Sequence, residues 1–368
     1  MEFIDLKTQY ERYKDEIDAR MKAVLDHGQF IMGPEIDEME TQLADFVGVK
    51  HCISVSSGTH SLEIALRALN IGQGDEVITV PFSWISSAEV IPLVGAKPVF
   101  VDIERGSFNM NPDLLESAIT KNTKAIMPVS LFGQMPNLEA IQAIANKHGI
   151  PVIEDAAQSF GASRNGVKSC GATLIGSTSF FPAKPLGCYG DGGALFTDDD
   201  DLATAMKAIR THGGVRRHHH TLVGTNGRFD TLQAAVILGK LPYFESEIAA
   251  RATAGDRYND LLKTFCTVPE TTEGNTHVYA QYTLRVDSEK RDTVVEDLKK
   301  EGIPVAVYYP TCFHEQPVFN YLGYQWGDFP ESEKASREVF SLPMHPFLTK
   351  EEQHLIADKL TFVLEKNS

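Results

Sequence analysis

One lysine in a glycine-rich segment is the first residue of this chain that suggests chemistry. Lys184 lies within residues 179–193, among small and apolar side chains. Desolvation lowers the pKa of an ammonium group and favours the neutral amine, which can form an imine with a carbonyl compound. The alternative is a surface loop whose lysine reaches into water, and for a lone lysine this alternative is the more common one. Lys184 therefore indicates a reaction only in combination with other groups.

A carboxylate strengthens the chemical interpretation of Lys184. Asp155 ends the apolar run 151–155, at the edge where a parallel sheet presents ligand-binding groups. A pyridine nitrogen needs such a carboxylate to stay protonated, and the protonated ring then acts as an electron sink. Gln158 follows, and its amide can bond a phenolic oxygen. The alternative for Asp155 is an N-cap of a following helix.

An anion site and an aromatic platform complete the set. Gly58 and Thr59 open a predicted helix directly after a predicted strand, so backbone amides and a hydroxyl would converge on a phosphate. The alternative is an ordinary capped helix, although Ser57 and Glu63 lack capping-box spacing. Trp84 follows the second predicted strand, where an indole can stack on a pyridine ring, but an aromatic there is more often part of the core. In combination these residues predict a pyridoxal-phosphate site.

Alternating strands and helices must position these residues. Between residues 51 and 156, short runs rich in valine and isoleucine alternate with helical patterns, which predicts a parallel sheet covered on both faces. We predict an α/β chain with a large domain over residues 1–245 and a smaller C-terminal α+β domain over residues 246–368. The predicted strands are 51–56, 77–81, 98–102, 125–131, 151–155, 279–286 and 305–309, and the predicted helices are 61–69, 112–119, 137–148, 231–264, 291–301 and 349–365.

The composition of the 368 residues excludes several classes of protein. A net charge of −16 argues against nucleic acid or an anionic membrane as a partner. No apolar stretch approaches the roughly 20 residues that span a bilayer, and the first residues lack the pattern of a secretory signal. The five cysteines are scattered and odd in number, which favours a reducing cytosol, and we assign none of them a metal. We therefore expect a cytoplasmic protein.

The motifs together resemble the DegT/DnrJ/StrS-type sugar-nucleotide aminotransferases, which are pyridoxal-phosphate enzymes of fold type I, the aspartate aminotransferase-like class. The resemblance covers essentially the whole chain and implies an α/β fold with a large, mostly parallel sheet domain and a smaller C-terminal domain. The segments that carry it are residues 56–59, 72–78, 154–159, 179–193 and 224–228.

The resemblance also implies a role for each candidate residue. Lys184 would carry pyridoxal 5'-phosphate as a Schiff base, Asp155 would pair with the ring nitrogen, and Gln158 would meet the phenolic oxygen. Trp84 would stack on the ring, where the family usually has Phe or Tyr. The phosphate would be held by Gly58, Thr59 and Ser179 of one subunit and by Asn226 of the other, so a homodimer with shared active sites is implied.

The amino donor and the sugar would use one site in turn, which calls for a cation that serves both. We expect glutamate as donor and Arg228 as the group that grips its carboxylate bidentately; the alternative for Arg228 is a structural ion pair. The stretch 216–220, from which we take His219 as a substrate contact, is a basic exception on an acidic chain and is suited to a diphosphate. The alternative is a solvated loop, and consecutive histidines do not indicate a metal site.

Among family members, this chain most resembles enzymes that aminate C3 of a UDP-linked 2-acetamido-3-keto-glucuronic acid on the route to O-antigen of lipopolysaccharide. Tyr308 stands where histidine is expected in those enzymes, and we expect it to contact the sugar and to alter its recognition. The second candidate substrate is a UDP- or dTDP-linked 4-keto-6-deoxy sugar that accepts nitrogen at C4. A non-catalytic relative would have lost Lys184 or Asp155, relatives with histidine at the lysine position perform dehydration, and a nicotinamide oxidoreductase would need a differently spaced glycine fingerprint.

Overall fold

The structure is a computed structural model that describes residues 1–216 and 218–367. Its centre is a mixed sheet in the order β1-β9-β8-β5-β4-β2-β3, in which parallel bridges at Ile126–Val152 and Val129–Asp155 join the two ladders. The predicted parallel pairing is confirmed for β5-β8, β2-β4 and β2-β3, whereas β9 runs antiparallel to both of its neighbours. The strands are β1 (His51–Val55), β2 (Glu76–Thr79), β3 (Lys97–Phe100), β4 (Thr123–Ile126), β5 (Ile153–Asp155), β8 (Ile175–Ser179) and β9 (Gly193–Thr197).

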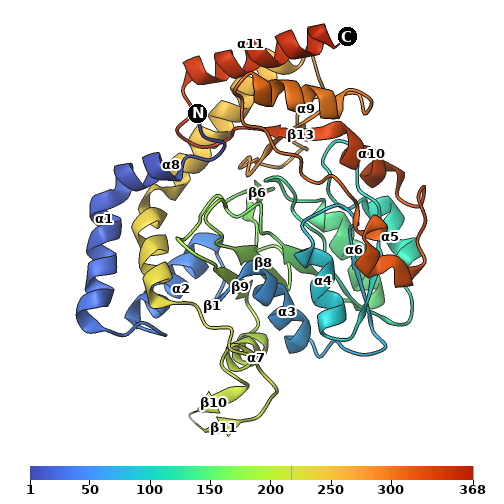
Figure 1. The fold of residues 1–368 in the computed structure, drawn as a ribbon. Coiled ribbons are helices and arrows are strands. Elements are labelled where there is room, and N and C mark those ends of the chain that lie inside the picture. The colour runs from blue at the N-terminus through green and yellow to red at the C-terminus, as the bar shows by residue number, and fades with distance from the viewer. Residues whose placement is uncertain (217, 368) are drawn as a thin grey trace.

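Helices cover both faces of this sheet (Figure 1). In β1, Cys52 packs with the cluster that contains α2 and α8, while the next residue, Ile53, packs with the cluster of α3 and α7. Phe196 and Leu195 of β9 divide between the same two clusters, because successive side chains of a strand point to opposite faces. The helices of this part are α1 (Leu6–His27), α2 (Pro34–Val47), α3 (Gly58–Ala68), α4 (Ser86–Leu93), α5 (Pro112–Ala118), α6 (Leu138–His148), α7 (Asp200–Arg210) and α8 (Thr231–Leu262).

Helix α8 connects the sheet to the C-terminal elements. It is one continuous helix of 32 residues that contacts α1 and α2 and also the last helix, α11. The proposed domain boundary at 245/246 falls inside α8, and the division into two domains stays a prediction. The C-terminal core is built by β12 (Tyr282–Arg285), α9 (Arg291–Lys300), β13 (Val339–Leu342) and α11 (Lys350–Lys366). Thr349 and Glu352 form a capping box at the N-terminus of α11.

The predicted strand at 305–309 is wrong. Only Ala306 bridges to β13, where it exchanges backbone hydrogen bonds with Ser341. Pro304 and Pro310 flank the segment, and a proline offers no N–H group to a ladder. The backbone leaves β13 after Ala306, so that Tyr309 can reach Gln158 in the large sheet domain.

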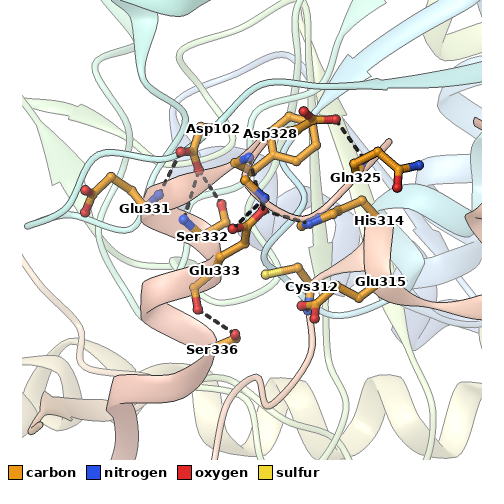
Figure 2. A network of polar contacts seen from close by, with 12 residues as sticks. Asp102, Cys312, His314, Glu315, Gln325, Asp328, Glu331, Ser332, Glu333 and Ser336 are labelled. Carbon is orange, nitrogen blue, oxygen red and sulfur yellow. Dashed lines mark hydrogen bonds and ion pairs between the residues drawn. The ribbon is translucent and has the colours of Figure 1, made fainter. Parts of the chain in front are cut away.

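The chain then returns to the large sheet through residues 312–338, which we call the return segment. It contains η1 (Phe313–Glu315), η2 (Pro317–Leu322) and α10 (Pro330–Glu338), and three of its phenylalanines pack with Ala88 and Phe100. Figure 2 shows Asp102, just after β3, facing the first turn of α10, where its carboxylate accepts from the amides of Glu331 and Ser332, each at 2.9 Å. A carboxylate at a helix N-terminus satisfies amides that have no partner within the helix.

Two short hairpins complete the described chain: β6 (Ser163–Arg164) with β7 (Val167–Lys168), and β10 (Gly214–Arg216) with β11 (His219–His220). The β10-β11 hairpin projects from the body of the molecule beyond α7 (Figure 1). Within the described residues, no helix combines the length and the apolar character needed to cross a membrane.

Candidate active site

Lys184 lies on an irregular loop between β8 and β9. The loop closes on itself, since the amide of Lys184 donates to Phe181 O at 2.8 Å and the amide of Cys188 donates to Phe180 O at 2.8 Å. Burial of the amine lowers the pKa of Lys184 from 10.5 to about 8, while the charge of Asp155 acts in the opposite direction. The amine is therefore neutral in a larger fraction of molecules near pH 7 than an ordinary lysine is.

Asp155 ends β5 at the carboxyl edge of the sheet, where it was predicted. Its Oδ2 accepts from the hydroxyl of Ser87 at 2.6 Å, and its Oδ1 accepts from the amide of Ala157 at 3.2 Å. Burial raises the pKa of this carboxyl, whereas Ser87, Ala157 and the nearby Lys184 charge lower it. Residues 156–161 form turns and no helix, so the helix-capping alternative for Asp155 is wrong.

The N-terminus of α3 begins at Gly58, beside the end of β8. A Cβ atom on Gly58 would lie 2.7 Å from the Cβ of Ser179, so only glycine lets these two segments meet. Ser57 caps the helix by accepting from the amide of His60 at 3.1 Å, and no described residue accepts a hydrogen bond from the amides of Gly58 and Thr59. Free amides beside the hydroxyls of Thr59 and Ser179 form a donor set that fits a phosphate.

Gln158 and Trp84 meet at a residue that the sequence did not single out. The Gln158 side chain accepts from the amide of Phe132 at 2.8 Å and donates from Nε2 to the hydroxyl of Tyr309 at 2.8 Å. The ring of Trp84 is 59% exposed and lies 6.5 Å from the ring of Tyr309, at a tilt of 44°. The indole thus has an open surface and shares its neighbour Tyr309 with Gln158, and its stacking role remains a prediction.

Three residues of this site were missed at the sequence level: Ser86, Ser87 and Tyr309. The first turn of α4 places Ser86 beside the hydroxyl of Thr59, at 2.7 Å, and Ser87 beside Asp155. A signal for the serines exists, because they follow the second predicted strand at its carboxyl end, where ligand-binding groups gather. Tyr309 gave no separate signal beside Tyr308, since its contact with Gln158 joins residues 151 positions apart.

Arg228 and Asn226 flank a residue that contacts the segment just before α3, since the amide of Ser56 donates to Gly227 O at 2.9 Å. They line a cavity of about 550 Å³ together with Ser56, Ser57 and Gly190. The Nε atom of Arg228 is buried and has no hydrogen-bond partner among the described residues, and no described carboxylate pairs with its guanidinium. The structural ion-pair alternative for Arg228 therefore has no support in this part of the chain.

His219 and Tyr308, the remaining predicted substrate contacts, lie in different surroundings. His219 is exposed on β11, at the tip of the projecting hairpin, and Arg217 of the same basic stretch lies outside the described residues. Tyr308 is half-buried, with its ring 6.3 Å from that of Phe3 and 5.7 Å from that of Tyr309. Within the single chain, Tyr308 contacts Tyr309, which bonds to Gln158 of the lysine site. His219 lies on the hairpin, away from these residues.

A larger cavity of about 900 Å³ lies at the opposite edge of the sheet. It is lined by residues from the C-terminal ends of α3, α5 and α6, among them Asn70, Lys121 and His148. None of the predicted site residues contributes to it. The groups that fit pyridoxal phosphate are instead an amine, a carboxylate, a phosphate-binding helix end and an aromatic ring, gathered at the carboxyl edge of the sheet.

Proteins of known family resemble this chain over nearly its whole length. A model of the DegT/DnrJ/EryC1/StrS aminotransferase family matches residues 11–361. A UDP-2-acetamido-2-deoxy-3-oxo-D-glucuronate aminotransferase of Pseudomonas aeruginosa is 52% identical over 362 residues, which cover 98% of this chain and 99% of that protein.

Solved structures agree with these sequence matches. A DegT/DnrJ/EryC1/StrS aminotransferase from Brucella abortus superimposes with a TM-score of 0.94 at 41% identity and covers 98% of both chains. NtdA from Bacillus subtilis, solved with the bound cofactor PMP, has a TM-score of 0.90 at 31% identity and covers 99% of this chain and 83% of its own. The predicted fold class and cofactor are confirmed by these neighbours.

Proposed function

We propose that this chain, which belongs to the DegT/DnrJ/EryC1/StrS aminotransferase family, transfers an amino group from glutamate to C3 of UDP-2-acetamido-2-deoxy-3-keto-D-glucuronic acid. The chain is a pyridoxal-phosphate-dependent aminotransferase of fold type I. The proposed sugar is supported by the 52% identity, over nearly the full chain, to the Pseudomonas aeruginosa enzyme. Its product would be a 3-amino sugar for the O-antigen of lipopolysaccharide, made in the cytoplasm.

The observation that carries the chemistry is the meeting of Lys184, Asp155 and the α3 N-terminus at one edge of the sheet. Asp155 would hold a proton on the ring nitrogen, and the free amides of Gly58 and Thr59 would bind the phosphate. The bound cofactor supplies an electron sink that stabilises negative charge on the carbon that loses its proton.

Lys184 has two tasks in the proposed reaction. Between turnovers its Nζ holds the cofactor covalently, which requires the neutral amine. In the first half-reaction the released amine would move the proton of the glutamate α-carbon to the cofactor carbon. In the second half-reaction it would move a proton from the cofactor carbon to C3 of the sugar. A pKa of about 8 suits both directions of transfer, because the amine gains and loses a proton readily near neutral pH.

The substrate groups are proposed to act across a homodimer. Asn226 and Arg228 face a cavity that Ser57 and Gly190 of the same chain also line, and the β10-β11 hairpin projects from the body (Figure 1). In a second copy these groups would supply an amide for the phosphate, a guanidinium for the carboxylates of glutamate and uronic acid, and His219 for the diphosphate. Tyr308 would contact the sugar from the same side as Tyr309.

The substrate is tested by offering two sugar nucleotides separately with glutamate and following 2-oxoglutarate release. We expect the UDP-linked 3-keto uronic acid to be used with a kcat/KM at least about 100-fold above that of a dTDP- or UDP-linked 4-keto-6-deoxy sugar, because the uronic carboxylate would be paired with Arg228. Preference for the 4-keto-6-deoxy sugar would replace the first substrate by the C4 alternative. A lack of turnover with both, in protein that has bound pyridoxal phosphate, would contradict both substrates.

A further inference from the structure

The loop that carries Lys184 has no regular secondary structure of its own. Residues 181–192 contain neither helix nor strand. The hydrogen bonds from Lys184 N and Cys188 N join the loop only to Phe181 and Phe180, at its beginning. A Cβ on Gly187 would lie 2.4 Å from Pro182 O, so the chain folds tightly back on itself at this point. The direction of the Lys184 side chain therefore depends on what holds the outer part of the loop, residues 187–190.

Two side chains of α8 hold that outer part. Lys240 donates from Nζ to Gly187 O at 2.7 Å, and Gln233 accepts through Oε1 from the amide of Tyr189 at 2.8 Å. The two residues are seven apart, which places them on the same face of the helix, two turns from each other. The backbone on either side of Cys188 is thus fixed to one rigid element.

Lys240 is an unusual residue in its own surroundings. It is 2% exposed, yet no described carboxylate lies within ion-pair distance of its Nζ. Its contacts are the Gly187 carbonyl and the face of the Tyr189 ring, whose centroid is 4.3 Å away. A buried cation is costly unless it is compensated. Burial lowers the pKa of Lys240 to about 8, while the charge of Glu247 raises it, and both groups in direct contact with Nζ belong to the lysine loop.

Gln233 also lines the cavity that contains Arg228 and Asn226. One side chain thus contacts the backbone of the lysine loop at Tyr189 and borders the proposed substrate groups. Helix α8 continues beyond Lys240 to Arg251, which donates to the carbonyls of Tyr279 and Met344 in the C-terminal part. The lysine loop is therefore anchored to the same helix that holds the C-terminal elements.

We propose that Lys240 and Gln233 are positioning residues that fix the loop of Lys184 and so set the direction and reactivity of its amine. The proposal rests on Lys184 being the cofactor lysine and is independent of which sugar is used. Neither residue touches the reacting atoms. Both act through the backbone of Gly187 and Tyr189.

The test compares Lys240→Met with Lys168→Met in the full-length protein. Methionine keeps an unbranched chain but removes the cation. Lys168 is the control, because its Nζ also lies over a ring, that of Phe46 at 3.4 Å, but its ion pair is with Glu245 at 3.5 Å and it makes no hydrogen bond to residues 181–192, all of which the structure describes. The readouts are the rate at which added pyridoxal phosphate bonds to the protein, the pH midpoint of the resulting absorbance band, and the melting temperature.

We expect Lys240→Met to slow cofactor capture by about tenfold and to move the pH midpoint by about half a unit or more, since small misplacements of a reacting group are costly. Lys168→Met should leave both readouts within about twofold and 0.2 unit of the parent. A lowered melting temperature with an unchanged capture rate and pH midpoint would overturn the proposal, because it would make Lys240 merely structural. An equal change in both variants would overturn it as well.

If Lys240→Met does not fold, two variants of Gln233 test whether the lysine loop is positioned from α8. Gln233 is partly exposed, so Gln233→Glu keeps an acceptor for Tyr189 N, while Gln233→Leu removes it. We expect slowed capture and a shifted midpoint in Gln233→Leu and near-parental values in Gln233→Glu. Parental values in both would contradict the proposal. Because no sugar is present, this outcome is separate from any failure of the proposed substrate.

Discussion

The cofactor half and the substrate half of this site differ in how completely a single chain builds them. Around the cofactor, Gly58 packs on Ser179, Ser87 donates to Asp155, and Gln158 donates to Tyr309. On the substrate side, the buried Nε of Arg228 has no partner in the described chain, and His219 is exposed on a projecting hairpin. The difference supports the proposed homodimer, in which one chain would hold most of the cofactor and a second copy would add Asn226 to the phosphate and Arg228 and His219 to the substrate.

Loss of the cofactor amine should have the largest effect. We expect Lys184→Ala to lower kcat by more than about 1,000-fold, because both the covalent anchor and the proton carrier are removed. The absorbance band of the lysine-bound cofactor should disappear. The control is Lys121→Ala, an exposed lysine at the opposite edge of the sheet, which should retain parental kinetics. Substantial turnover by Lys184→Ala would remove this residue from the mechanism.

Loss of the Asp155 carboxylate should have the second-largest effect on kcat. We expect Asp155→Asn to lower kcat by roughly 100-fold, since an amide cannot hold a proton on the ring nitrogen as a carboxylate does. Asparagine can still accept from Ser87, so the melting temperature should change little. Steady-state kinetics, together with the spectrum of the bound cofactor, measure the effect. A parental kcat would show that the ring nitrogen does not need Asp155.

The lowered pKa of Lys184 predicts how cofactor capture depends on pH. Only the neutral amine reacts, and this form dominates above a pKa of about 8. The rate should therefore rise roughly 50-fold between pH 6 and pH 8 and then level off. N-acetyl-lysine methyl amide in solution is the control, because its rate should keep rising toward pH 10. A protein rate that followed the same curve as this free amine would contradict the effect of burial.

The substrate half should give a smaller and more selective effect. We expect Arg228→Lys to raise KM for glutamate by about tenfold, because an ammonium group cannot reproduce the two parallel hydrogen bonds of a guanidinium. The affinity for pyridoxal phosphate should stay unchanged, as the cofactor half lies in the other part of the site. An unchanged KM for both glutamate and sugar would exclude bidentate binding by Arg228. Weakened cofactor binding would contradict the separation of cofactor-binding from substrate-binding groups.

The sequence predicted the groups that follow strand ends better than it predicted their partners. Asp155 and Gly58 could be predicted because Asp155 is the last residue of one short run and Gly58 lies two residues after the end of another. The contacts of Ser87 with Asp155 and of Tyr309 with Gln158 join residues 68 and 151 positions apart, and no local pattern encodes such distances. The strand predicted at 305–309 failed for a related reason: its apolar residues serve a long-range contact and not a ladder.

Strand β8 escaped prediction because its residues are small. Its sequence, Ile-Gly-Ser-Thr-Ser, has little of the branched apolar character that marks a buried strand. The structure needs that small size, since a Cβ on Gly176 would lie 2.3 Å from Cys170 O and Ser177 meets Ser61 of α3 through their hydroxyls. Close packing of helix on strand here favours serine and glycine over valine.

The return segment has a consequence for the order in which the molecule is completed. Asp102 bonds to Ser332, which is synthesised 230 residues later. Until then α10 cannot cover the edge of the sheet beside β3. At about 5–20 residues per second, this gap corresponds to roughly 10–50 s of synthesis during which Phe100 lacks its aromatic cover. While it is bound to the ribosome, the chain therefore exposes the apolar edge of the sheet beside β3 until residues 313–338 have been synthesised. Chaperones can bind this edge during that period.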